Sequence, residues 1–245
     1  LEPEYQRIIK RSTIPLIEFR QIGPNDYSSK YLIFERINTG SVKLNSMQIR
    51  KSLAYGKFIN DLYETADSCV ELKSLFSNNA IKKDAHVEAL LRIIVMSDIY
   101  YRGYKFEKSG INNILNSYCE SNKKTLISKK YVEDLSNAIK MMYSVFGERK
   151  NIFRKVEKIN GEELSFVGNL NVSILEAMLG VIIEKKIVLA DINAVEIKNR
   201  YLNTMYDILE KSFNREEENP FSISTGTLQS IRKRFEICEG ILGCR

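Results

Sequence analysis

The stretch Tyr31-Leu-Ile-Phe-Glu-Arg-Ile-Asn-Thr-Gly-Ser-Val-Lys-Leu-Asn-Ser-Met-Gln-Ile-Arg50 predicts a helix, a glycine turn and a second helix. The apolar residues at its beginning are spaced as in a short helix. We expect this helix to end at Asn38-Thr39-Gly40, because Gly40 can adopt a positive φ without a steric cost. The stretch therefore predicts two helices that meet at a tight, polar loop.

The start of the second helix is the better defined of the two. Asn45 is a preferred N-cap residue, and Gln48 stands at the N3 position, where its amide can reach back to the cap. Leu44 and Ile49 have the spacing of a hydrophobic staple. We expect this helix to begin after Asn45 and to continue through Arg50 to about residue 55.

Charged side chains gather around this turn, and two interpretations of them stay open. A helix start carries free N–H groups and positive partial charge, so it attracts anions. Arg36 and Arg50 would add charge-assisted hydrogen bonds to a phosphate or a carboxylate. In the alternative, Glu35, Arg36 and Arg50 form a buried network that ties the two helices together. The residues by themselves favour this structural alternative.

The composition is that of a soluble globular protein. The 245 residues allow one large domain or two smaller domains. We find no signal peptide and no apolar run of membrane-spanning length, so we expect a cytoplasmic protein without a membrane partner. The net charge of +6 permits contact with nucleic acid but does not require it. The chain begins at Leu1 and not at Met, so we expect either a removed N-terminus or a fragment.

The residues that usually carry chemistry are few. The four cysteines are scattered and His86 is the only histidine, so we expect no metal site and free thiols in a reducing compartment. One histidine excludes a His–Asn–His nuclease site, which needs at least two. Neither a Walker A sequence nor a Gly-x-Gly-x-x-Gly fingerprint occurs. The catalytic residues are therefore unknown.

Apolar residues recur at helical spacing through most of residues 46–245, as at Val87, Leu90, Leu91 and Ile94. Residues 14–19 instead predict an edge strand that contains Pro15. Residues 152–166 predict a small hairpin around Asn160-Gly161. The predicted fold class is mainly α: a multi-helix bundle or array, with a short β remnant of an α/β unit at the N-terminus and one small hairpin.

A basic cluster, Arg232-Lys233-Arg234, lies on the last predicted helix beside its apolar stripe. We expect the three side chains to point outward, where they would contact DNA phosphates. A solvated helix face without a ligand is the alternative interpretation of the same cluster.

The segment from Ile33 to Arg50 resembles the signature of the N-terminal domain of GmrSD-type, modification-dependent restriction proteins. In that family a strand with Ile-Pro and apolar residues precedes the signature, and Ile14-Pro15-Leu16-Ile17 matches it. Glu88-Ala-Leu-Leu-Arg92 resembles a later helix of the family, with an arginine after paired leucines. Residues 225–242 resemble its terminal helix, so the similarity spans most of the chain.

The resemblance implies a ParB/sulfiredoxin-like α/β unit followed by a helical region. Residues 1–45 would be the remnant and rim of the α/β unit, with the signature loop, and residues 46–245 the helical domain. The family's Asp-Gly-Gln-Gln-Arg motif, which is linked to nucleotide hydrolysis, does not occur in this sequence. The C-terminal His–Asn–His nuclease domain of many members does not occur either. We therefore expect this chain to be catalytically incomplete by itself.

By the same resemblance, a nucleotide- or phosphate-binding rim would face the missing catalytic motif. Arg36 and Arg50 are the candidates for contact with phosphate, and Asn38 and Thr39 would shape the pocket. The full set of rim residues is Glu35, Arg36, Asn38, Thr39, Gly40, Gln48 and Arg50. The resemblance implies NTP with Mg²⁺ as cofactor of the full-length protein and no cofactor for this chain alone. The implied partners are DNA and the missing α/β unit or a partner nuclease subunit.

Two functions therefore remain open. In the first, the chain is the helical half of a nucleotide- or DNA-handling domain in a bacterial GmrSD-like defence (restriction) protein. Full-length relatives suggest an NTP-dependent nuclease or NTPase, and this chain alone would be inactive. In the second, the chain is a non-enzymatic module that binds DNA or assembles with another protein.

Overall fold

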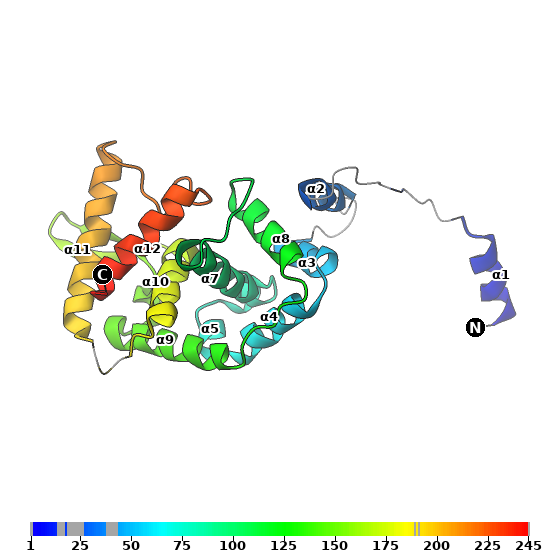
Figure 1. The fold of residues 1–245 in the computed structure, drawn as a ribbon, viewed down its shortest axis with the longest axis horizontal. Helices are drawn as coiled ribbons and strands as arrows, with labels where there is room; N and C mark the ends of the chain where they lie inside the picture. The colour runs from blue at the N-terminus through cyan, green and yellow to red at the C-terminus, as the bar shows by residue number, and fades with distance from the viewer. Residues whose placement is uncertain are drawn as a thin grey trace.

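The computed structural model describes residues 2–13, 18, 27–37, 44–188, 190 and 192–244. These residues form twelve α-helices, a short 3-10 helix and one two-stranded antiparallel sheet, so the predicted mainly α fold is confirmed (Figure 1). The first helices are α1 (Pro3–Arg11), α2 (Tyr27–Ile37), α3 (Ser46–Leu53), α4 (Lys57–Ser68), α5 (Val70–Ser74) and α6 (Asn78–Ile81). The remaining elements are α7 (Ala85–Tyr101), α8 (Ile111–Ser121), α9 (Lys130–Phe146), η2 (Arg149–Asn151), β1 (Lys155–Ile159), β2 (Glu163–Val167), α10 (Val172–Lys185), α11 (Ala194–Phe213) and α12 (Leu228–Leu242).

Two apolar helices, α7 and α10, pack against each other at the centre of the helical body (Figure 1). Residues 173–182 of α10 are all buried, and α7 is buried on more than the single stripe that its spacing predicts, since Ala89 and Ile93 are also inaccessible. A helix that is apolar on most sides must be covered on most sides. The other helices supply this cover and thereby form one continuous core.

The covering helices are distributed around this central pair. Helices α4 and α8 pack on α7, α9 packs on α10, and α12 contacts both central helices. Helix α11 lies against α9 and α12, at the side of the molecule where the chain ends (Figure 1). This arrangement brings α7, α10 and α12 together, although they are far apart in the sequence.

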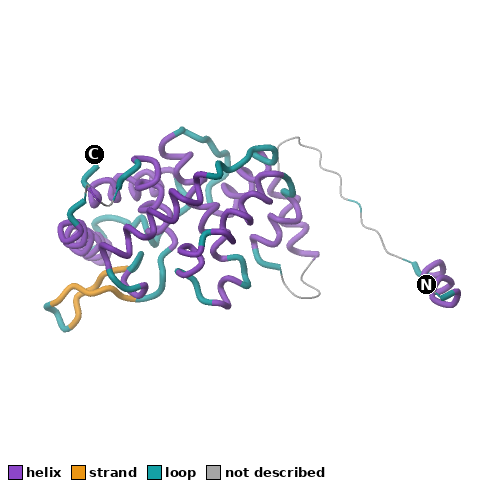
Figure 2. Tube along the Cα trace, turned by 90° about the horizontal axis from the view of Figure 1, so that it is seen from below, coloured by secondary structure: helices purple, strands orange, loops and turns teal. Residues whose placement is uncertain are grey.

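The predicted hairpin is confirmed as β1 and β2, which pair from Lys155 with Val167 to Ile159 with Glu163 (Figure 2). Asn160 and Gly161 in its turn both have positive φ, as the Asn-Gly sequence predicts. The hairpin packs on α11.

The N-terminal elements differ in how they relate to the helical body. Every residue of α1 is exposed, and α1 lies apart from the other helices in both views (Figures 1 and 2). Helix α2 instead packs against α3 and α8. The strand predicted at residues 14–19 lies outside the described residues except for Glu18, and the domain division after residue 45 stays a prediction. Among the described helices, none combines the length and the apolar character that a membrane span requires.

Candidate functional site

The capping box predicted at the start of α3 is present. The Asn45 side chain accepts a hydrogen bond from the Gln48 backbone N–H (2.9 Å), and the Asn45 N–H donates to Oε1 of Gln48 (3.0 Å). The Asn45 amide also donates to the carbonyl of Lys83, which attaches the cap to the chain before α7. Such a cap contributes about 1 kcal/mol. Gln48, one of the predicted rim residues, therefore has a structural role at the helix start.

Arg50 of α3 is completely buried, and its guanidinium group is held by several partners. Its Nε donates to Asn116 (2.9 Å) and its Nη2 to Asn112 (2.7 Å), both on α8. Its Nη1 lies 3.2 Å from a carboxylate oxygen of Glu88 on α7. Arg50 thus connects α3 to α7 and α8, as expected if its role is structural. Its partners on these helices, however, are not the expected Glu35 and Arg36.

Glu35 and Arg36 have a different environment from Arg50, because both are exposed near the end of α2. Helix α2 packs on α3, so the two exposed residues lie on an element that contacts the capped helix. The rest of the predicted rim, Asn38, Thr39 and Gly40, lies outside the described residues. The nucleotide-binding role of all these residues stays a prediction.

The basic cluster on α12 is arranged differently from the prediction. Arg232 is exposed, and Lys233 is half-buried and pairs with Glu217 (2.5 Å). Arg234 is completely buried and donates to the carbonyls of Pro220 (3.1 Å) and Thr225 (3.0 Å). The prediction that Arg234 points outward is therefore wrong.

The physical reason is the helical period of α12. Arg234 stands three residues after Ile231 and four before Cys238, and both of these residues are buried. Residues separated by three or four positions share one face of a helix. Arg234 therefore lies on the apolar stripe of α12 and not on its solvated face.

A second buried ionic network joins the central helices, and one of its members was not predicted from the sequence. Glu176 of α10 is completely buried between two arginines, with 2.6 Å to Nη2 of Arg234 and 2.6 Å to Nε of Arg92. Burial acts to lower the pKa of Arg92, but the Glu176 carboxylate raises that pKa above its ordinary value. Glu176 could have been suspected, because it interrupts an apolar run on α10 and a buried carboxylate requires a partner.

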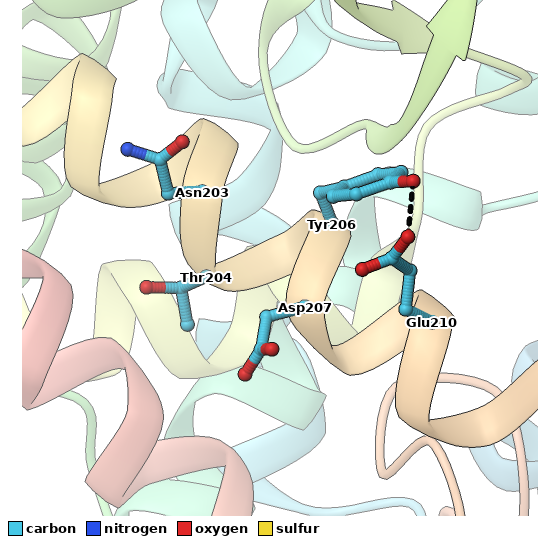
Figure 3. Close-up of a pocket in the computed structure, with 5 residues that line it drawn as sticks. All are labelled: Asn203, Thr204, Tyr206, Asp207 and Glu210. Atoms are coloured by element: carbon cyan, nitrogen blue, oxygen red, sulfur yellow. Dashed lines mark hydrogen bonds between the residues drawn. The ribbon is translucent and has the colours of Figure 1, made fainter. Parts of the chain in front are cut away.

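A shallow surface depression on α11 is lined by Asn203, Thr204, Tyr206, Asp207 and Glu210 (Figure 3). The Tyr206 hydroxyl donates to the Glu210 carboxylate one helical turn away (2.5 Å). The Nζ atom of Lys158 lies 4.6 Å from the centre of the Tyr206 ring. These contacts are typical of a solvated helix face, and we assign no chemistry to the depression.

The described residues contain no group of three His, Cys, Asp or Glu side chains that could hold a metal ion. His86 is buried in the first turn of α7, and its Nε2 lies 3.0 Å from a carboxylate oxygen of Asp67. Comparison with known proteins found no family model, no curated protein and no solved structure that matches this chain.

Proposed function

We propose that this chain is the helical half of a nucleotide- or DNA-handling domain in a GmrSD-like bacterial defence protein, and that it is catalytically incomplete alone. The observation that carries the proposal is the exposure of Glu35 and Arg36 at the end of α2, a helix that packs on the capped helix α3. In this proposal NTP and Mg²⁺ bind where the end of α2 meets the α/β unit that the resemblance implies.

Helix α2 is attached to α3 and α8, and a binding rim requires such support. The Lys30 ammonium group donates to the carbonyl of Leu53 at the end of α3 (2.8 Å) and pairs with Glu120 of α8 (2.7 Å). The Tyr31 hydroxyl donates to the same Glu120 carboxylate (3.1 Å). These contacts fix α2 on its neighbours two turns before Arg36. An arginine presented from such a support suits the planar, two-point recognition of a phosphate.

The two arginines of the signature would then have different tasks. Arg36 would contact the phosphate, because it is exposed. Arg50 would support the site, because its hydrogen bonds to Asn112 and Asn116 hold α3 against α8. Loss of Arg36 should therefore reduce activity, whereas loss of Arg50 should first reduce stability.

The thiols support the cytoplasmic location that belongs to this proposal. Cys69, Cys119 and Cys238 are free and buried in the core. Burial raises the pKa of Cys119 to about 12, so its thiol stays protonated and unreactive at neutral pH. Free thiols of this kind are typical of proteins from a reducing compartment.

The test is NTP hydrolysis by the full-length protein with Arg36→Ala, compared with the wild type. We expect turnover to fall by at least about tenfold, because a charge-stabilising contact is lost, while the melting temperature stays within about 2 °C. Arg232→Ala is the matched control, since Arg232 is an exposed arginine on the distant helix α12. If the Arg36→Ala variant hydrolyses NTP at the wild-type rate, the proposal is wrong.

A second candidate, a non-enzymatic DNA-binding module, is favoured by the exposure of Arg232 beside half-buried Lys233. Its test is the double variant Arg232→Ala/Lys233→Ala, with duplex-DNA affinity read by fluorescence anisotropy over a salt series. Arg234 is left intact, since its removal would disturb the core. A lower affinity with a flatter salt dependence supports DNA contact at α12. An unchanged affinity would show that this face of α12 is solvated and does not contact DNA.

A further inference from the structure

Asn160 and Gly161 form the exposed turn of the hairpin β1–β2, and the dipeptide Asn-Gly occurs once in the sequence. Both residues have a positive φ, 53° for Asn160 and 79° for Gly161. The Glu162 N–H donates to the carbonyl of Ile159 (3.2 Å) and closes the turn over them. An asparagine amide therefore stands directly before a glycine N–H at the tip of the hairpin.

The two groups that could react with each other in this turn are accessible and unengaged. Among the described residues, no hydrogen bond involves the Asn160 side chain or the Gly161 N–H. A Cβ at Gly161 would meet no other atom within 4 Å, so no neighbouring group crowds the glycine. The Gly161 nitrogen is thus open to approach by Cγ of Asn160, and both atoms are open to solvent.

The other asparagines of the chain have different surroundings. Asn60 and Asn203 lie inside α4 and α11, where the N–H that follows each asparagine belongs to the helical hydrogen-bond ladder. Asn171 caps α10, and its Nδ2 donates to the carbonyl of Phe221 (3.2 Å). Asn169 is exposed like Asn160, but it precedes Leu170, whose side chain packs on the core. Asn160 therefore combines an exposed amide with an unhindered neighbour.

The hairpin is fixed at its base and exposed at its tip. Val156 is buried, and the ring of Phe166 lies 5.8 Å from that of Phe146 and 6.1 Å from that of Tyr201. Residues 157–163 are all exposed. A purely structural role for Asn160-Gly161 is to supply the two positive φ angles of the turn. Aspartate would supply the first of them equally well, so this role does not require the side-chain amide.

We propose that Asn160 is a site of spontaneous deamidation, with the Gly161 nitrogen as the nucleophile. The Gly161 nitrogen loses its proton to water or hydroxide and attacks Cγ of Asn160. A bond forms between these two atoms, the bond from Cγ to Nδ2 breaks, and Nδ2 gains a proton and leaves as ammonia. Water then opens the resulting succinimide at either of its carbonyls, which gives aspartate or isoaspartate. The sum of the steps is the hydrolysis of one amide.

The two products have different effects on the hairpin. Aspartate adds a negative charge beside Glu162 and Glu163 but preserves the turn, since Asp-Gly also favours it. Isoaspartate inserts an additional carbon atom into the main chain, so the bond from Glu162 to Ile159 and the adjoining strand register are disturbed. The anchored base confines this disturbance to the tip. The site lies on a different element from Arg36, and its chemistry is independent of the role proposed for that residue.

The test follows the folded chain by tryptic peptide mapping during incubation in mildly alkaline buffer. Trypsin cleaves after Lys158 and Lys185, so Asn160, Asn169 and Asn171 lie in one peptide, and fragment-ion spectra show which of them has become an acid. We expect conversion at Asn160 to be at least about tenfold faster than at Asn169, because glycine lets its N–H approach without a Cβ. Labelling by an isoaspartate methyltransferase identifies the isoaspartate form.

Two variants make the result specific. Asn160→Gln should convert at least about tenfold more slowly than the wild type, because its longer side chain must close a larger and less favourable ring. Asn160→Asp carries the charge of the product on an unchanged main chain. Hydrogen exchange at the hairpin should therefore be faster in the isoaspartate form than in both Asn160→Asp and the fresh wild type.

Three results contradict the proposal. An intact Asn160 in the folded chain, with conversion there in the urea-unfolded chain, would show that the turn protects the amide. Equal rates at Asn160 and Asn169 would show that Gly161 has no special part in the reaction. Equal hydrogen exchange in the isoaspartate form and in Asn160→Asp would contradict the loosening of the tip.

Discussion

Nη2 of Arg234 lies 2.6 Å from Oε1 of Glu176, and neither side chain is exposed to solvent. Arg92 occupies the other oxygen of the same carboxylate, so one acidic residue joins α7, α10 and α12. Burying these charges is costly, but removing one partner costs more, because the others then remain buried without compensation. This network places Arg234, the last residue of the basic cluster on α12, in the core, whereas Arg232 of the same cluster is exposed.

Arg234→Ala should therefore lower the free energy of unfolding by about 3–5 kcal/mol, because it leaves part of the Glu176 charge buried and unpaired. Urea unfolding followed by circular dichroism measures this difference. Lys233→Ala is the control, since its pair with Glu217 is partly solvated and should contribute less than about 1 kcal/mol. Equal effects of the two substitutions would contradict the assignment of Arg234 to the core.

Arg50→Ala should lower the free energy of unfolding by about 3 kcal/mol, whereas Arg36→Ala should change it by less than about 0.5 kcal/mol. The reason is that Arg50 is buried and is the donor for Asn112 and Asn116 of α8, and Arg36 is exposed. Chemical unfolding of the two variants provides the measurement. Arg50→Lys should not restore stability, since one ammonium group does not reproduce the fork of a guanidinium.

The sequence predicts local features of this fold well and distant pairings poorly. The Asn45–Gln48 capping box and the Asn160-Gly161 turn depend on neighbours within a few residues, and both are confirmed. The partners of Arg50 on α8 stand 62 and 66 positions away, and no local pattern identifies them. The prediction for Arg234 failed for a different reason. The helical period of α12 places Arg234 on the buried face, but its charge suggested that the side chain would be exposed to solvent.

Gly180 of α10 lies close to side chains of α7 and α12. A Cβ at this position would stand 2.6 Å from Oγ of Ser97 and 2.9 Å from Cε1 of Phe235. Gly180→Ala should therefore lower the free energy of unfolding by about 1–3 kcal/mol, because the tightly packed core must shift. Differential scanning calorimetry would show this as a lower melting temperature. Gly180→Ala combined with Ser97→Ala should regain part of the loss, since one of the close contacts is then removed.

Glu120 should make stability depend on acidic pH. Burial acts to raise the pKa of Glu120, but the bonds from Lys123 and Lys30 lower it below its ordinary value of 4.5. A carboxylate with a lowered pKa in the folded state stabilises the protein above the unfolded pKa and loses this effect as the pH falls through the folded pKa. Glu120→Gln should therefore be less stable than the wild type at neutral pH. The difference should shrink below about pH 4.5, as urea unfolding at several pH values would measure. A difference that is independent of pH would contradict the role of this charge.

Photo-crosslinking of azido-ATP and azido-GTP to the full-length protein tests the proposed nucleotide rim most directly. Trypsin cleaves after Lys30 and Arg36, so the end of α2 is recovered as the peptide from Tyr31 to Arg36. We predict that one of the nucleotides labels this peptide or the adjoining residues 37–43, and that excess unlabelled nucleotide removes the label. Label confined to other peptides, in a protein that hydrolyses the nucleotide, would contradict the proposal that α2 forms the rim of the site.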